Sequence, residues 1–299
     1  MNYTEMRNPN TSEIDQLSTE YVLKLINEED QKVAPALATP QIIQPLTGLV
    51  DSVVTAFQAG GRLFYIGAGT SGRLGILDAS ECVPTFGVSP SLVQGLIAGG
   101  STAITHAVEG AEDSTTLGAE DLKAHGLTNK DVVIGLAASG RTPYVISGLK
   151  FAQATGCVTG AISCNSDALI SQYANYPIEA IVGPEILTGS TRMKAGTAQK
   201  LLLNMISTTA MIKIGKTYSN LMVDLQPTNS KLVDRAQRII AEATGVSKTE
   251  AHQYYLASHR RPKVAILMIL AQIDEKAAEN QLTDAHGRIA DSLSRINAN

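Results

Sequence analysis

Apolar residues recur at helical spacing through the first sixty positions of the chain. One stripe runs from Ile14 to Ile26 and a second from Leu46 to Phe57. From residue 62 the pattern changes to short apolar runs separated by helical stretches. These runs lie at 63–66, 92–98, 132–137, 158–163 and 178–182. Five buried strands joined by helical crossovers predict an α/β fold, with a five-stranded parallel sheet sandwiched by helices.

After residue 224 only helical spacing remains, which predicts a small C-terminal helical domain over 225–299. The residues before the sheet predict an N-terminal helical segment over 1–58 that packs on the core, and 59–224 form the α/β domain. With 299 residues and 44% hydrophobic content, the chain can bury one substantial core and a smaller second one.

The segment 62–81 is the most informative for chemistry. A strand runs into the turn Gly67-Ala-Gly-Thr-Ser-Gly72, and a helix follows that ends at Glu81. Glycines allow close backbone approach and positive φ, so amides at the start of the helix can face an anion. Thr70 and Ser71 add hydroxyl donors. The pattern predicts a phosphate cradle that includes Gly69, Thr70 and Ser71.

Two further polar turns follow strands later in the chain. Ala138-Ser-Gly-Arg-Thr-Pro143 leads into a helix with Pro143 in its first turn. In Gly189-Ser-Thr-Arg-Met-Lys194, Ser190 or Thr191 is expected to cap a helix that continues to about Ile214. Ligands of parallel sheets bind beyond the carboxyl ends of the strands, so the turns should converge. The predicted binding residues here are Ser139, Gly140, Arg141, Thr142, Ser190, Arg192 and Lys194.

Spacing and composition narrow the class of ligand. The first turn departs from G-x-G-x-x-G, and no G-x-x-x-x-G-K-[ST] occurs, so a phosphate monoester is favoured over a dinucleotide, a nucleoside triphosphate or a purely structural turn. A net charge of -4 argues against nucleic acid and membrane surfaces as partners. No secretory segment or membrane-length apolar run occurs, which favours a cytoplasmic location. The three cysteines have no disulfide or metal-ligand spacing, and no metal site is predicted.

Glu81 and Glu112 are the candidate acid and base residues. Glu81 closes the helix after the first turn, and Glu112 lies in the acidic segment 106–113. Composition and spacing alone favour a solvent-exposed carboxylate in both cases. A catalytic role for either one requires a further observation.

The three turns resemble those of the N-acetylmuramic acid 6-phosphate etherases, a family of the sugar isomerase (SIS) domain superfamily related to glucokinase regulatory protein. The resemblance extends to Leu96-Ile-Ala-Gly-Gly100, to the segment 106–113 and to Asn220-Leu-Met-Val-Asp224, and it covers nearly the whole chain. It implies a SIS domain with a UBA-like helical C-terminal domain. It also implies a cytoplasmic homodimer that acts in cell-wall recycling, needs no cofactor, and has its site near the subunit interface.

The resemblance also implies an activity and residue roles. A lyase of this family cleaves the lactyl ether of a phosphorylated muramic acid, giving N-acetylglucosamine 6-phosphate and D-lactate. Glu81 would protonate the departing lactate oxygen, and Glu112 would be the second acid–base residue. The 6-phosphate would be held by Ser71, Ser139 and Thr142. Arg141, Arg192 and Lys194 are candidates for the lactyl carboxylate, each weighed against a structural ion pair.

Two rival functions share this pattern. A phosphosugar aldose-ketose isomerase would use the same fold and phosphate turns but release no lactate. A non-enzymatic sugar-phosphate sensor would bind without reaction, as in a regulatory protein with two such domains in a longer chain. One set of turns and both glutamates in 299 residues favour the enzyme.

The separation of Ser71 and Glu81 poses a geometric problem. A straight helix between them rises about 15 Å, which exceeds the reach from phosphate to C3 of one sugar. Either the helix bends or ends early, or Glu81 serves a pocket whose phosphate turns belong to a neighbouring subunit.

Overall fold

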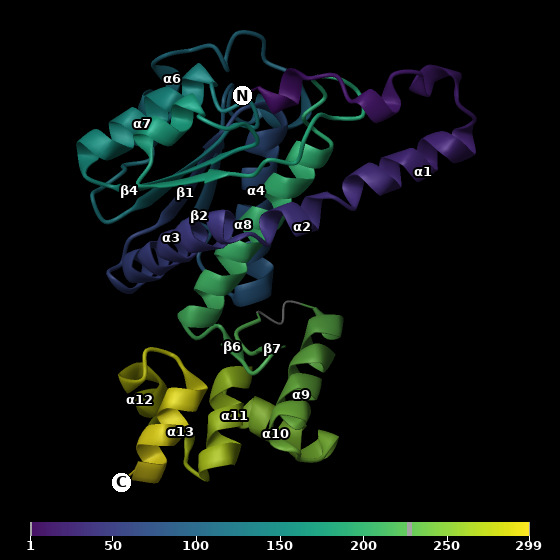
Figure 1. Ribbon diagram of the computed structural model, residues 1–299. Coiled ribbons are helices and arrows are strands. Elements are labelled where there is room, and N and C mark those ends of the chain that lie inside the picture. Colours follow the sequence, from purple (N-terminus) through teal and green to yellow (C-terminus); the bar gives the residue numbers. More distant parts are fainter. Residues whose placement is uncertain (1, 226–228, 299) are drawn as a thin grey trace. The chain divides into compact units, whose positions relative to one another are not determined.

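The computed structural model of the protein describes residues 2–225 and 229–298 (Figure 1). The chain divides into two compact units. The first holds the residues up to Ser80 together with Pro90–Ser207, and the second holds Glu81–Ser89 together with the residues from Thr208 onward. The second unit therefore starts before residue 225 and also includes the end of an earlier helix.

A five-stranded parallel sheet forms the centre of the first unit, as the sequence predicts. Its order is β2-β1-β3-β4-β5, and every neighbouring pair is parallel. The strands are β1 (Leu63–Gly67), β2 (Val93–Ile97), β3 (Val132–Leu136), β4 (Val158–Ser163) and β5 (Tyr176–Glu179). The last strand starts two residues earlier than its apolar run. As an edge strand it buries only Ile178 fully, so it lacks the continuous apolar signal of the inner strands.

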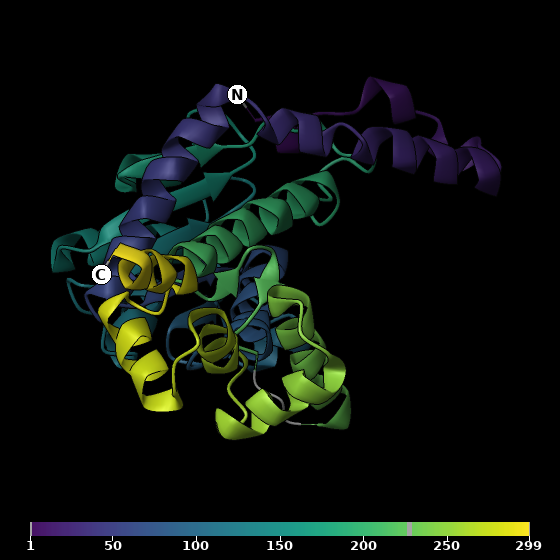
Figure 2. The same ribbon diagram turned by 90° about the horizontal axis from the view of Figure 1, so that it is seen from below.

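Helices cover both faces of the sheet (Figure 1). On one face lie α6 (Leu117–Ala124) and α7 (Pro143–Thr155), which enclose a core that includes Phe64, Val133 and Leu149. On the other face α3 (Pro40–Gln58) lies over the strands, as Figure 2 shows. A Cβ at Gly160 would lie 2.7 Å from Leu49 Cδ2, so the glycine in β4 lets α3 approach closely.

The remaining helices of this unit connect the strands or precede the sheet. They are η1 (Tyr3–Glu5), η2 (Pro9–Thr11), η3 (Ile14–Gln16), α1 (Thr19–Asp30), α2 (Val33–Leu37), α5 (Thr102–Thr105) and η4 (Leu169–Tyr173). Two longer helices, α4 (Gly69–Phe86) and α8 (Lys194–Lys213), start in the first unit and end in the second.

The two apolar stripes of the N-terminal segment differ in how deeply they are buried. The α3 stripe is buried, with Leu49 and Val53 fully covered. The earlier stripe is divided, because the Ser18 side chain accepts the Tyr21 N–H and starts α1 at Thr19. Tyr21 and Leu23 on α1 are 65% and 62% exposed, and Figure 1 shows α1 projecting from the rest of its unit.

The second unit is helical apart from a short hairpin of β6 (Thr217–Tyr218) and β7 (Leu221–Met222). Its helices are α9 (Ser230–Thr244), α10 (Lys248–Ala257), α11 (Pro262–Ala271), α12 (Glu275–Asp284) and α13 (Ile289–Ala298). The largely apolar α11 lies at the centre of their core. Within 2–225 and 229–298, no helix combines the length and apolar character that spanning a membrane requires.

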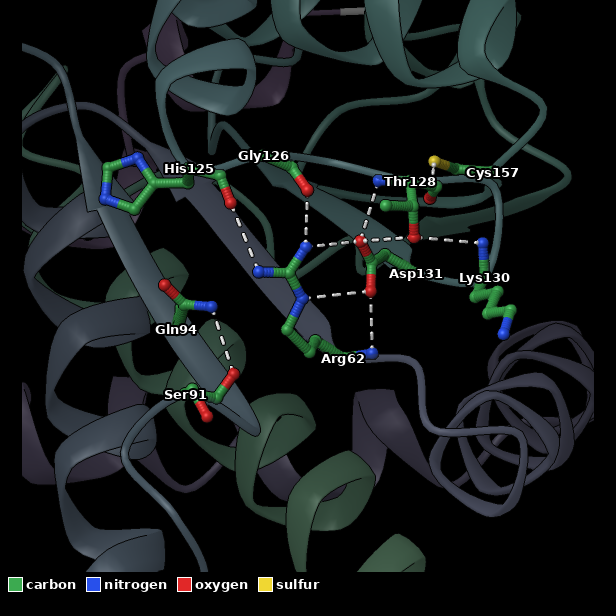
Figure 3. A network of polar contacts seen from close by, with 9 residues as sticks. All are labelled: Arg62, Ser91, Gln94, His125, Gly126, Thr128, Lys130, Asp131 and Cys157. Carbon is green, nitrogen blue, oxygen red and sulfur yellow. Dashed lines mark hydrogen bonds and ion pairs between the residues drawn. The ribbon is translucent and has the colours of Figure 1, made fainter.

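A polar network closes the amino-terminal end of the sheet (Figure 3). The buried Asp131 carboxylate, just before β3, accepts three hydrogen bonds from Arg62 at 2.7–3.1 Å and one from Thr128 N at 2.8 Å. Burial would raise the pKa of Asp131, but the donors from Arg62 and Thr128 outweigh it and lower that pKa. The opposite, carboxyl-terminal end of the sheet carries the glycine-rich turns.

Candidate functional site

All three predicted turns meet at one cavity of about 530 Å³ beyond the carboxyl ends of the strands. Gly69, Thr70 and Ser71 come from the first turn, and Ser139, Arg141 and Thr142 from the second. Gly189 and Thr191 come from the third. Gly140, Ser190, Arg192, Lys194 and Glu81 are not among the lining residues.

The β1–α4 turn depends on its glycines. Gly69 has φ of +51°, in the left-handed region. A Cβ at Gly67 would lie 2.8 Å from Gly72 N, and one at Gly72 would lie 2.6 Å from Ile97 Cγ1. Because the turn is this tight, α4 begins at Gly69 and its first residues line the cavity. The amino end of a helix favours an anion at that place.

The second turn joins β3 to α7. Pro143 is the first residue of α7, and Thr142 stands at the N-cap without a side-chain capping bond, which leaves its hydroxyl available. Gly140 is buried behind the turn with φ of +72°, and a Cβ there would lie 2.5 Å from Ala168 Cβ. Gly140 thus shapes the turn. The side chain of Arg141 is 58% exposed, with Nη2 4.0 Å from Glu5 Oε1.

Neither Ser190 nor Thr191 caps the helix after the third turn, contrary to the sequence prediction. Instead the buried Glu185 carboxylate accepts the N–H groups of Lys194 and Ala195, at 3.0 and 2.9 Å. A carboxylate there satisfies two N–H groups of the first turn and interacts favourably with the helix dipole, so α8 starts at Lys194. It ends at Lys213, one residue before the expected limit.

Lys194 is held in a buried ion pair. Its Nζ lies 2.6 Å from Glu29 Oε2, and both side chains are at most 3% exposed. Burial would raise the pKa of Glu29, but hydrogen bonds from Lys194, Lys32 and Asn10 lower it to about 2. This geometry fits the structural ion pair that the sequence left open as the alternative role of Lys194.

The two candidate glutamates occupy different surroundings. Glu112 is exposed and lines the cavity, and it also lines an adjoining cavity of about 190 Å³ with His106 and Glu109. Its backbone oxygen accepts the Tyr144 N–H at 3.0 Å, which fixes this segment against α7. Glu81 is exposed on α4, which continues without a break from Gly69 to Phe86. The helix therefore does not end before Glu81.

Sequence reasoning missed two polar residues at the site. Glu5 lines the cavity from η1, and no motif in the sequence surrounds it. Gln199, on α8, accepts the hydroxyl proton of Ser71 at 2.8 Å. Its only local signal is that it follows the third turn by less than two helical turns. Among the described residues, no group of three or more His, Cys, Asp or Glu side chains could hold a metal ion.

Comparison with known proteins finds two matching family models and a similar solved structure. Residues 45–153 match the family described as the glucokinase regulatory protein N-terminal SIS domain, and 219–288 match the C-terminal lid domain of glucokinase regulatory protein. Among solved structures, a phosphoheptose isomerase from Francisella tularensis superimposes with a TM-score of 0.51 at 17% identity. That match covers 66% of this chain and 99% of the isomerase, and it shows the fold alone.

Relatives of much higher identity cover almost the whole chain. An N-acetylmuramic acid 6-phosphate etherase from an Exiguobacterium species is 58% identical over 97% of this chain and 98% of its own length. Etherases of the same name from a Geobacillus species and from Clostridium botulinum are 56% and 57% identical, over 97% and 98% of this chain and 98% and 97% of their own lengths. The chain therefore belongs to the N-acetylmuramic acid 6-phosphate etherase family.

Proposed function

We propose that this protein cleaves the lactyl ether of N-acetylmuramic acid 6-phosphate, releasing D-lactate and N-acetylglucosamine 6-phosphate as a carbon–oxygen lyase of the cytoplasm. One observation carries the proposal. Hydroxyl-bearing turns and the Glu112 carboxylate line a single cavity, in a chain 58% identical to a protein named as this etherase. The reaction requires a phosphate-binding end and an acid–base group in the same cavity, together with a second proton-transfer group.

The chemistry needs two proton-transfer groups. An unactivated ether is a poor leaving group, but in the open-chain sugar C2 lies next to an aldehyde, so its proton is acidic. Removal of that proton expels lactate from C3, and water then adds to C3 of the unsaturated aldehyde. One group takes the C2 proton and another protonates the ether oxygen. Two carboxyl groups, one ionised and one protonated, can fill both roles. The scheme uses no metal or cofactor because the aldehyde supplies the activation.

The geometry of the turns supports the proposed phosphate roles. Ser71, Ser139 and Thr142, with Gly69 and Thr70, would hold the 6-phosphate at the amino end of α4. Gly140 and Ser190 would shape the second and third turns. Arg141 would bind the lactyl carboxylate, because it lines the cavity whereas Arg192 does not and Lys194 is paired with Glu29.

The catalytic roles belong to the two glutamates. Glu112 would take the C2 proton, since it lines the cavity. Glu81 would protonate the lactate oxygen. Because α4 continues unbroken past Glu81, about 15 Å of helix separates it from Ser71. We therefore place Glu81 in the pocket of a second subunit of a homodimer, with each site built from both chains.

Isotope labelling tests the function. The purified protein is incubated with the substrate in ¹⁸O-labelled heavy water, and both products are examined by mass spectrometry. We expect lactate with its original ether oxygen, and an amino sugar phosphate carrying ¹⁸O at C3 and deuterium at C2. With Glu81→Gln we expect deuterium exchange at C2 without lactate release. With Glu112→Gln we expect neither deuterium exchange nor lactate release.

Other outcomes would favour other functions. An isomerase would exchange C2 but release no lactate, and a sensor would leave the substrate unchanged. Label in the lactate would mean attack on the lactyl carbon and would contradict the elimination.

A further inference from the structure

Ser71 differs from the other hydroxyl residues of the cavity. Its Oγ donates to Gln199 Oε1 at 2.8 Å, in a buried hydrogen bond. The hydroxyls of Thr70, Ser139 and Thr142 donate to no partner within the described chain. A serine hydroxyl has one proton, and a phosphate dianion offers acceptors only. In this arrangement Ser71 has no proton left to give to a phosphate.

Gln199 has its own unsatisfied group. The residue is fully buried, and its Nε2 has no acceptor among residues 2–225 and 229–298. A buried amide N–H without a partner is costly and uncommon in native proteins. A half-turn about the last side-chain bond would place Nε2 opposite Ser71 Oγ. The amide would then donate, the Ser71 oxygen would accept, and the Ser71 proton would be free to point into the cavity.

The backbone that carries Gln199 is firmly held. Glu185 and the Glu29–Lys194 pair fix the start of α8. One turn before Gln199, a Cβ at Gly196 would be in ordinary contact with Thr70 Cγ2 at 3.5 Å, so α8 lies against the first turn. The terminal amide is thus the part of this contact that can change without moving either helix.

We propose that Gln199 is a positioning residue for phosphate recognition. When the phosphate arrives, the Gln199 amide reverses and donates to Ser71 Oγ, and the Ser71 O–H group, which keeps its proton, turns from the amide oxygen to donate a hydrogen bond to a phosphate oxygen. No covalent bond forms or breaks. The inference rests on the proposed role of Ser71 as a phosphate ligand, and it explains the unsatisfied Nε2 as the donor that the bound state uses.

Substitutions that change the direction of this hydrogen bond test the proposal. Gln199→Glu gives a group of the same shape that, when ionised, only accepts and so retains the Ser71 proton. Gln199→Met removes both donor and acceptor and leaves that proton free. Binding of N-acetylglucosamine 6-phosphate is measured by calorimetry for each variant, alone and combined with Ser71→Ala. Ser207→Ala, on the same helix and bonded to Asp78 instead, is the matched control.

The proposal predicts how much each substitution weakens binding of N-acetylglucosamine 6-phosphate. Ser71→Ala should weaken binding about tenfold, as for loss of a hydrogen bond to a charged group. Gln199→Glu should weaken it by at least as much at neutral pH, recovering at low pH as the new carboxyl is protonated. Gln199→Met should weaken it only about threefold, and Ser207→Ala should leave it unchanged. In the Ser71→Ala background, Gln199→Met should have no further effect and Gln199→Glu a smaller one.

The same measurements distinguish failure of the phosphate role of Ser71 from failure of the positioning role of Gln199. If Ser71→Ala leaves the affinity unchanged, the phosphate assignment fails and this inference fails with it. If Ser71→Ala weakens binding but Gln199→Glu has the same effect in both backgrounds, only charge repulsion acts and the positioning role is refuted. Should Gln199→Glu not fold, a Gln199→Met effect that persists in the Ser71→Ala background contradicts the proposal equally.

Discussion

At the scale of single residues, the structure distinguishes three cationic side chains that the sequence alone could not rank. Arg141, Arg192 and Lys194 all lie in or beside polar turns, yet Arg141 alone of the three lines the cavity. The partner of Lys194 is Glu29, 165 residues earlier in the chain. No local pattern reports such a contact. The hydroxyls of Ser71, Ser139 and Thr142 could be predicted to converge because each follows a strand, and parallel strands end at one edge.

Arg141→Met should therefore weaken substrate binding. We expect KM to rise between about tenfold and a hundredfold, the range for losing a charge-assisted hydrogen bond, with the midpoint of thermal unfolding little changed. Steady-state lactate release and a thermal melt measure the two quantities. Arg192→Met is the matched control, and its KM should stay close to that of the unmodified protein. Equal KM values for both variants would remove Arg141 from the carboxylate site.

At the scale of elements, the buried Glu29–Lys194 pair joins α1 to α8. Removing Glu29 leaves the buried Lys194 charge without its ion-pair partner, whereas removing both residues can be nearly neutral. Glu29→Met should lower the free energy of unfolding by about 3–5 kcal/mol, and Glu29→Met with Lys194→Met by clearly less. Urea unfolding measures both variants. Equal losses would show that the pair itself contributes little.

The same ion pair predicts that the stability of the folded protein depends on pH. The pKa of Glu29 is lowered from 4.5 to about 2 in the folded protein, so the unfolded chain binds the proton more readily. Its stabilisation is complete above about pH 4.5 and is lost as the pH falls towards 2, on the order of 3 kcal/mol in total. A Glu29→Gln protein should lack this component of the acid-induced loss of stability.

Elements were predicted better than their ends. Continuous apolar runs identified the inner strands β1, β3 and β4, because both faces of the sheet are covered. The edge strand β5 was displaced by two residues since only Ile178 is fully buried. The cap of α8 was assigned to Ser190 or Thr191 by local rules, but Glu185 reaches that end through the fold of its own loop. Helix ends depend on such contacts, which spacing does not report.

At the scale of the whole molecule, the unbroken α4 carries both Ser71 and Glu81. Ser71 lines the cavity at the start of this helix, and Glu81 lies ten residues further on. If one sugar must reach both, the proposed homodimer is part of the active site. Chains that are inactive alone should then restore each other's activity.

Mixed dimers test this claim most directly. A heterodimer of one Glu81→Ala chain and one Glu112→Ala chain is purified with two different tags and assayed for lactate release against each homodimer. Glu112 lines the same cavity as Ser71, and its loss is expected to abolish the reaction. We predict about half of the unmodified activity, because one of two shared sites keeps both residues intact, while both homodimers are inactive. A chain with both substitutions paired with an unmodified chain should be inactive. No activity in the first heterodimer, with half activity in the second, would contradict an active site built from both subunits.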